Sequence, residues 1–268
     1  MVKKFIYLVV AYIFCGWGFV LATPTTYIWT PSTDIQPYGK IHLNLDNYTP
    51  ISSRDANGNR LYVQQVYGPT FSLLSDKPED NILGKLWQPL DKLGLETGFD
   101  YKKGLGLALD RYPVYFHFKF AVGEDVYFKY MPAFAFGMYD IGYKKNRTNN
   151  NILYYRLAKT VILGNFLGNF NLGRYSAGYF RGNGKLLRDE KGLRDNSGIL
   201  LSWDRALSEI NERLWLCVDY QDSHSAYGAI NYGLAWEITN SVSVIVAYDI
   251  YNNKNLKPTI TFQLDVDF

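Results

Sequence analysis

Apolar and polar residues alternate with a two-residue period along most of the chain. The clearest case is the C-terminal end, Pro258 to Phe268, where apolar residues occupy every second position from Ile260 onward and Thr, Gln and Asp fill the positions between them. Successive side chains of a β-strand point to opposite faces, so this pattern predicts a strand with one apolar and one polar face. Residues 242–251 and 230–238 repeat the pattern, with Ile245 as an apolar exception.

The same alternation, with turn residues between the segments, predicts twelve strands. We expect them at residues 36–46, 64–75, 93–103, 112–122, 127–143, 151–163, 168–181, 197–207, 213–222, 226–239, 242–252 and 258–268. The alternation is weaker from the fifth strand to the eighth, where Lys159 and Arg174 fall on the face that is otherwise apolar. A β-bulge, which shifts the faces by one residue, would account for such positions.

A two-residue period fits both a soluble β-sandwich and a membrane-spanning barrel, whose apolar faces point in opposite directions. The lengths of the connections favour the barrel. Those after odd-numbered strands are polar and often long, whereas most of the others are tight turns such as 239–241. This asymmetry and the even strand count are typical of outer-membrane barrels. The exception is Asp76 to Asp91, which is too long for a tight turn and is expected to be partly helical or to extend the third strand.

The N-terminus has the layout of a secretory signal peptide. Lys3 and Lys4 precede an apolar run from Phe5 to Val20, and a cleavage site that ends in the small Ala22 follows it ahead of Thr23. The run is short for a membrane-spanning helix, which needs about 20 residues. We therefore expect residues 1–22 to be a cleaved signal peptide, residues 23–35 a periplasmic segment and residues 36–268 the barrel.

Composition narrows the function classes. The chain has 28 Lys and Arg against 25 Asp and Glu, and loss of Lys3 and Lys4 with the signal peptide leaves the charges nearly balanced, which argues against nucleic-acid binding. Cys217 is then the single cysteine, so an internal disulfide is ruled out in the mature chain. With 23 Tyr and 17% aromatic residues, the composition suits a barrel with aromatic belts.

The last strand, TITFQLDVDF, resembles the C-terminal assembly signal of outer-membrane β-barrels, with Phe262, Leu264, Val266 and the terminal Phe268 on its apolar face. This resemblance implies recognition by the barrel assembly machinery and location in the bacterial outer membrane. The chain also resembles porin-like outer-membrane proteins, notably through GILLSWDRALSEI from Gly198 and AYDIYNN from Ala247. The resemblance implies a transmembrane, all-β, antiparallel up-and-down barrel, but it identifies no solute.

In such a barrel the polar faces point into the lumen. The predicted lumen-lining residues are mostly acidic: Asp46, Glu96, Asp100, His117, Lys119, Arg156, Asp204, Asp219, Glu237, Asp249, Asp265 and Asp267. A water-filled lumen with this excess of carboxylates would prefer cations. The alternative is that these groups pair with one another and, together with the bulky Trp215, Tyr115 and Tyr154, fill a narrow lumen.

The sequence contains little that indicates catalysis. Asp222-Ser223-His224-Ser225 is the one candidate cluster for a hydrolase at the outer rim, although neighbours in sequence rarely form a triad. His42 and His117 have no second His or Cys at ligand spacing, and no phosphate-binding or dinucleotide-binding motif occurs, so we expect no metal and no cofactor.

Three hypotheses follow. The first is a monomeric channel for passive diffusion of small hydrophilic solutes or ions. The second is a structural or binding barrel with a closed lumen, and the third is a rim hydrolase that uses His224. Basic loop residues, among them Lys144, Arg147 and Lys185, are further expected either to meet anionic lipopolysaccharide or to be simply solvated.

Overall fold

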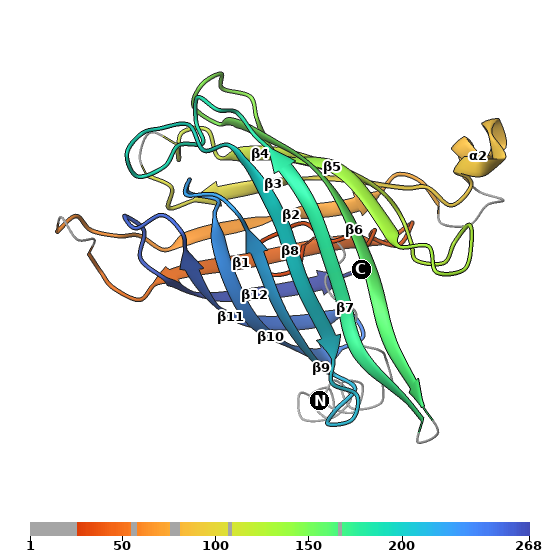
Figure 1. Cartoon of the computed structure of the whole chain (residues 1–268). Coiled ribbons are helices and arrows are strands. Elements are labelled where there is room, and N and C mark those ends of the chain that lie inside the picture. Colours follow the sequence, from red (N-terminus) through yellow and green to blue (C-terminus); the bar gives the residue numbers. More distant parts are fainter. Residues whose placement is uncertain (1–25, 55–57, 76–80, 107–108, 166–167) are drawn as a thin grey trace, which may run out of the picture.

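A computed structural model describes residues 26–54, 58–75, 81–106, 109–165 and 168–268. Twelve antiparallel strands in this part of the chain form one closed barrel, in which each strand pairs with its neighbours in sequence and β1 pairs with β12 (Figure 1). The strands are β1 (Ile41–Pro50), β2 (Gln64–Ser72), β3 (Gly94–Lys103), β4 (Val114–Val122), β5 (Ala133–Gly142), β6 (Asn149–Asn165), β7 (Gly168–Arg181), β8 (Ser197–Ala206), β9 (Leu214–Gln221), β10 (Ala229–Thr239), β11 (Val242–Tyr251) and β12 (Thr259–Asp267). The predicted all-β up-and-down barrel is confirmed. The predicted signal peptide, residues 1–22, lies outside the described residues.

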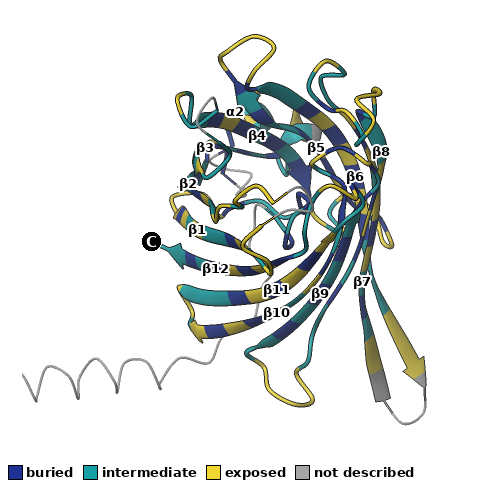
Figure 2. Cartoon of the chain, turned by 90° about the vertical axis from the view of Figure 1, so that its left-hand side faces the viewer, coloured by how far each residue is buried: buried dark blue, intermediate teal, exposed yellow. Residues whose placement is uncertain are grey.

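The distribution of polar and apolar residues is the reverse of that in a soluble protein. In β9, Trp215, Cys217, Asp219 and Gln221 are buried, whereas the alternate residues from Leu214 to Tyr220 are partly exposed on the outside. The same alternation appears as banding along the strands in Figure 2. Large apolar side chains such as Phe116, Leu234, Val246 and Ile260 are exposed on the outer face, and most buried charged groups face inward. The described residues contain no helix that is long and apolar enough to cross a membrane.

We call the end of the barrel where β1 terminates the loop end, and the opposite end the turn end. Residues 51–63, 104–113, 143–148, 182–196, 222–228 and 252–258 connect strands at the loop end. At the turn end, β10 and β11 are joined by residues 240–241, but the connection from β2 to β3 is long. Its described part contains the helix α2 (Ile82–Leu86) and the 3-10 helix η1 (Gln88–Leu90), and α2 projects from the barrel (Figure 1).

Two details differ from the expectations. β1 begins at Ile41 and not at residue 36, because its register follows β12: the Ile41 amide donates to the Phe268 carbonyl, and the Phe268 amide donates back to Ile41. A register shift between Val161 and Ile162 interrupts the pairing of β6 with β7. The two exceptions to the alternation pair regularly before this shift: Lys159 binds Glu124 and Asp125 near the turn end, and Arg174 points inward, where it binds Asp34 and Asp204.

Candidate functional site

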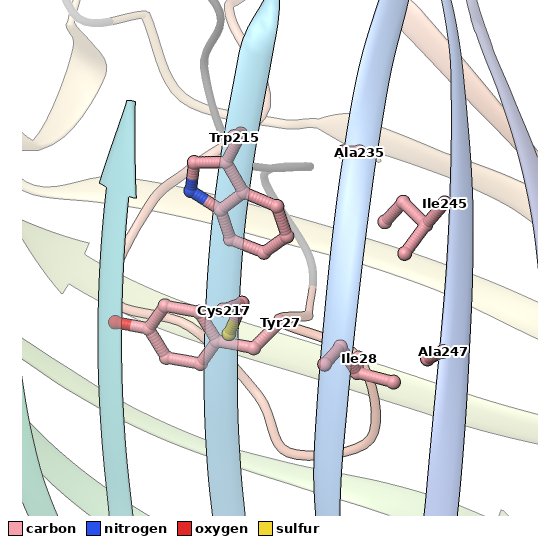
Figure 3. Close-up of a cluster of buried hydrophobic side chains, with 7 residues drawn as sticks. All are labelled: Tyr27, Ile28, Trp215, Cys217, Ala235, Ile245 and Ala247. Atoms are coloured by element: carbon pink, nitrogen blue, oxygen red, sulfur yellow. The ribbon is translucent and has the colours of Figure 1, made fainter. Parts of the chain in front are cut away.

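A segment of the N-terminus lies inside the barrel. Residues 26–36, which we call the strap, include the fully buried Tyr27, Ile28 and Thr30. Tyr27 and Ile28 pack against inward-facing residues of β9, β10 and β11 to form an apolar cluster that includes Trp215 and Cys217 (Figure 3). Residues 23–35 are predicted to form a periplasmic segment, whereas the described part of this segment lies in the lumen.

Two buried ionic groups hold the middle of the strap. The Asp219 carboxylate accepts hydrogen bonds from the amides of Trp29 and Thr30, at 3.0 and 2.7 Å, and from the Thr30 hydroxyl at 2.9 Å. The Arg156 guanidinium donates to the Thr30 hydroxyl oxygen and to the Pro31 carbonyl, each at 2.7 Å. Hydrogen bonds that involve a charged group are stronger than neutral ones, so these contacts fix the strap across the lumen.

Further contacts hold both ends of the strap. Arg174 forms a two-pronged ion pair with Asp34, at 2.6 and 2.7 Å. The backbone amide of Gln36 donates to the Glu96 carboxylate of β3 at 2.9 Å. The side-chain amide of Gln263, on β12, donates to the Ile28 carbonyl at 2.8 Å. The strap therefore has partners on strands from several sides of the barrel.

The strap lies between two cavities. The loop-end cavity, about 570 Å³ in volume, has Trp29 and Pro31 of the strap in its wall, together with loop residues such as Leu105 and Tyr227. The turn-end cavity, about 800 Å³, has Asp34 of the strap in its wall together with residues of the 240–241 turn. Asp265 of β12 is in the wall of both cavities, so the two spaces approach each other beside the strap.

The residues predicted to line the lumen are buried, apart from Asp46, Asp100 and Asp267, which are partly exposed. They fall into three groups. The wall of the loop-end cavity contains Asp46, Glu96, Asp100, His117, Lys119 and Asp265. The wall of the turn-end cavity contains Asp204, Glu237, Asp265 and Asp267. Arg156 and Asp219 bind the strap, and Asp249 accepts hydrogen bonds from the hydroxyls of Thr259 and Thr261.

Many of the charged lumen groups are paired. Lys119 lies 2.9 Å from Glu96, and Lys102 bonds to Asp140. His42 bridges two carboxylates, with Nε2 at 3.2 Å from Asp265 and Nδ1 at 3.0 Å from Asp267. These pairs show that part of the acidic excess is neutralised within the wall. Sequence reasoning missed Lys102 and Asp140 as a pair, because the left-handed backbone of Asp140 and a register shift in β5 alter the alternation there.

Tyr227 of the 222–228 loop connects the strap with the barrel wall. Its carbonyl accepts a hydrogen bond from the Trp29 indole at 2.9 Å, and its hydroxyl donates to Asp140 and accepts from Asn150 at 2.7 Å. Burial and the adjacent Asp140 carboxylate raise the pKa of Tyr227 well above its usual value. The phenol therefore stays protonated at neutral pH and acts as a donor.

The cluster considered for hydrolysis is at the loop end. His224 is exposed, and its Nδ1 lies 3.9 Å from Glu190. The Ser223 hydroxyl donates to the Asp195 carbonyl at 3.0 Å and lies 2.7 Å from the Ser225 hydroxyl. In the described structure both serines are thus engaged with each other and the backbone, and this arrangement differs from that of an activated nucleophile, which bonds to a histidine base.

The terminal strand presents the residues of the proposed assembly signal to the outside. On the outer face of β12, Phe262 is exposed and Leu264 and Val266 are partly exposed. Phe268, which follows the strand, is also exposed. The described residues contain no group of three or more His, Cys, Asp or Glu side chains placed to hold a metal ion.

No protein-family model and no curated protein matches the sequence. Solved structures with a similar arrangement include an outer membrane channel from Pseudomonas putida F1, at 10% identity and a TM-score of 0.45, covering 88% of this chain and 98% of that one. The KdgM porin aligns at 9% identity and a TM-score of 0.44, covering 85% and 98% of the two chains. OmpF of Salmonella typhi aligns at 6% identity and a TM-score of 0.40, covering 85% and 96%.

Proposed function

We propose that this chain is a channel of the bacterial outer membrane through which small hydrophilic solutes or ions diffuse passively, with a preference for cations, and that the strap narrows its lumen. The observation that carries the proposal is the pair of cavities, one at each end of the barrel, with Asp265 in the wall of both. Together these cavities leave open space along the barrel on both sides of the strap.

The outer surface supports the location. Exposed apolar side chains such as Leu43, Phe136 and Val246 would be unfavourable in water but suit lipid. Closure of β1 on β12 pairs every strand on both edges, which the hydrocarbon interior of a membrane requires because it offers no hydrogen-bond partners. Contacts of the basic loop residues with lipopolysaccharide, and of Phe268 with the assembly machinery, belong to the same proposal.

The charge of the lumen supports the preference for cations. Glu96, Asp140 and Asp265 each have a basic partner within 4.0 Å, whereas Asp46 accepts its hydrogen bond from the neutral Asn44 at 3.2 Å. A partly neutralised acidic wall attracts cations through its remaining negative field.

Single-channel conductance of the refolded chain from Thr23 onward, measured in a planar bilayer under a KCl gradient, tests this function. We expect small cation-selective steps, and larger steps from a variant that lacks residues 23–36. Both samples should first show the heat-dependent gel mobility of a folded barrel. Folded protein that gives no conductance in either form would refute a channel.

The second candidate function is a structural or binding barrel with a closed lumen. It is favoured by the buried hydrogen bonds of Arg156 and Asp219 to the strap, because the strap occupies the lumen as long as these bonds are formed. Conductance from the strap-deletion variant but none from the full mature chain would support this candidate over the constitutive channel.

A further inference from the structure

Asp46 differs from the other carboxylates in the wall of the loop-end cavity. Its side chain is partly exposed on the inner face of β1, and it accepts a hydrogen bond from Asn44 at 3.2 Å. Among the basic residues that line the same cavity, Lys102, Lys119 and His42 lie against Asp140, Glu96 and Asp265. His117 lies 3.8 Å from Asp100, and Arg147 is exposed in the 143–148 loop. In the described residues no ion pair to Asp46 is formed, so its carboxyl group is open to a ligand.

A second carboxylate of this wall carries an unused acceptor. Asp265 has one oxygen 3.2 Å from His42, but its Oδ2 is buried and has no hydrogen-bond partner within the described structure. The Asp265 side chain is 6% exposed. A buried carboxylate oxygen without a donor is costly, and the attraction of a cation bound in the adjoining cavity would reduce that cost.

Aromatic and apolar groups line the cavity beside Asp46. Tyr48 lies two residues further along the same face of β1, and its ring meets that of Trp29 edge to face, with the centroids 5.2 Å apart. Val66, Leu105 and Leu109 add apolar surface. Aromatic rings attract cations through their faces and also bury apolar groups.

These features favour an organic cation. A volume of about 570 Å³ is large for a bare inorganic ion and falls within the usual range of small-molecule sites. Apolar walls with one open carboxylate suit a molecule that has a single ammonium group on an apolar body.

We propose that the loop-end cavity binds organic ammonium ions, with the ammonium group at Asp46 and the apolar body against Trp29 and Tyr48. This inference rests on the proposed function, since it names a class of solute for the same lumen. The site lies on the loop-end side of the strap, and Trp29 of the strap forms part of its wall.

Titration calorimetry of the refolded mature chain in detergent tests the site, with 2-phenylethylammonium chloride as the probe. We expect saturable binding, with 3-phenylpropionate giving none because its charge is opposite. Asp46→Asn should weaken binding by about tenfold to a hundredfold, the usual effect of losing a hydrogen bond to a charged group. Asp46→Glu, which keeps the charge, should retain most of the affinity and shows that the position tolerates substitution.

Asp125→Asn, in the 123–132 connection at the turn end, is the matched control and should bind as the unaltered chain does. Equal affinity of the unaltered chain and Asp46→Asn, or equal binding of the ammonium and the carboxylate probe, would overturn the inference. Conductance of the same preparations separates it from the proposed function. Binding without conductance would refute the channel and keep the site, whereas conductance without binding would refute the site alone.

Discussion

Arg156 of β6 donates a hydrogen bond of 2.7 Å to the hydroxyl oxygen of Thr30 in the strap, and the same hydroxyl donates to Asp219 of β9 at 2.9 Å. One threonine side chain therefore joins two buried, oppositely charged groups of the barrel wall. The strap stays in the lumen as long as this connection and its neighbours persist.

Thr30→Val keeps the shape of the side chain but removes its hydroxyl. Leaving buried polar groups without a partner costs about 1 to 3 kcal/mol, so the strap should leave its site about five to a hundred times more often. Cys217 is 1% exposed and packs beneath Tyr27 and Ile28, and its rate of labelling by a small maleimide reports this displacement. Thr49→Val, at the exposed loop end of β1, serves as the control. Equal labelling of all three proteins would show that the hydroxyl does not hold the strap.

Val246→Arg places a charge at the centre of the outer face of β11, where Val246 is exposed. Arginine at the middle of a bilayer destabilises a barrel by about 2 to 4 kcal/mol, and by about 0 to 1 kcal/mol near the interface. Ile250→Arg, close to the end of the same strand, should therefore have the smaller effect. Guanidinium unfolding in phospholipid vesicles measures both. A larger loss for Ile250→Arg would contradict the proposed position of the barrel in the membrane.

Gly98→Val tests the packing between β2, β3 and β4. A Cβ at residue 98 would lie 2.2 Å from the Pro69 carbonyl oxygen and 2.6 Å from Nε2 of His117, so the strands would have to shift. Overpacking of this kind costs about 1 to 3 kcal/mol, which should appear as a lower unfolding midpoint. Gly123→Ala is the control, because its Cβ would make an ordinary contact of 3.5 Å with Val126. An unfolding midpoint unchanged by Gly98→Val would mean that β2, β3 and β4 can shift apart without a loss of stability.

Tyr227→Phe removes the hydroxyl that donates to Asp140 and accepts from Asn150. The 222–228 loop should open more often, because the lost bonds contribute about 1 to 3 kcal/mol at a partly buried site. Chymotrypsin cleaves after both Tyr and Phe, so faster cleavage after residue 227 reports the opening directly. Tyr143→Phe, at an exposed position, is not expected to change this rate. Cleavage after residue 227 that is no faster than in the unaltered chain would show that the hydroxyl bonds do not restrain the loop.

The strands could be predicted because their signal is local. In β12 the alternation from Ile260 to Asp267 is complete, and the structure gives Thr259–Asp267 for a predicted strand of 258–268. Alternation alone could not predict the residue at which β1 begins, because that residue is set by the pairing of Ile41 with Phe268.

No local pattern in the sequence predicted that the strap lies inside the barrel. Its contacts join residues far apart in sequence, such as Ile28 with Gln263 and Asp34 with Arg174. Residues 26–36 have no two-residue period, and polar residues such as Thr30 and Ser32 are equally typical of an exposed tail. The carboxylates of the lumen were identified from their strand faces, but which of them are neutralised depends on pairs across strands, such as Lys102 with Asp140.

The pairing of β1 with β12 also sets the order of events during folding. His42 is opposite Asp267, so the seam of the barrel joins residues from the two ends of the chain. Contacts between residues so distant in sequence form slowly, because a long loop of chain must first be closed. The barrel cannot close before β12 has been synthesised, because β12 is the partner of β1. The strap is close to the N-terminus, but it can bind in the lumen only after β9 and β12 have formed. These two strands carry Asp219 and Gln263, which hydrogen-bond to the strap.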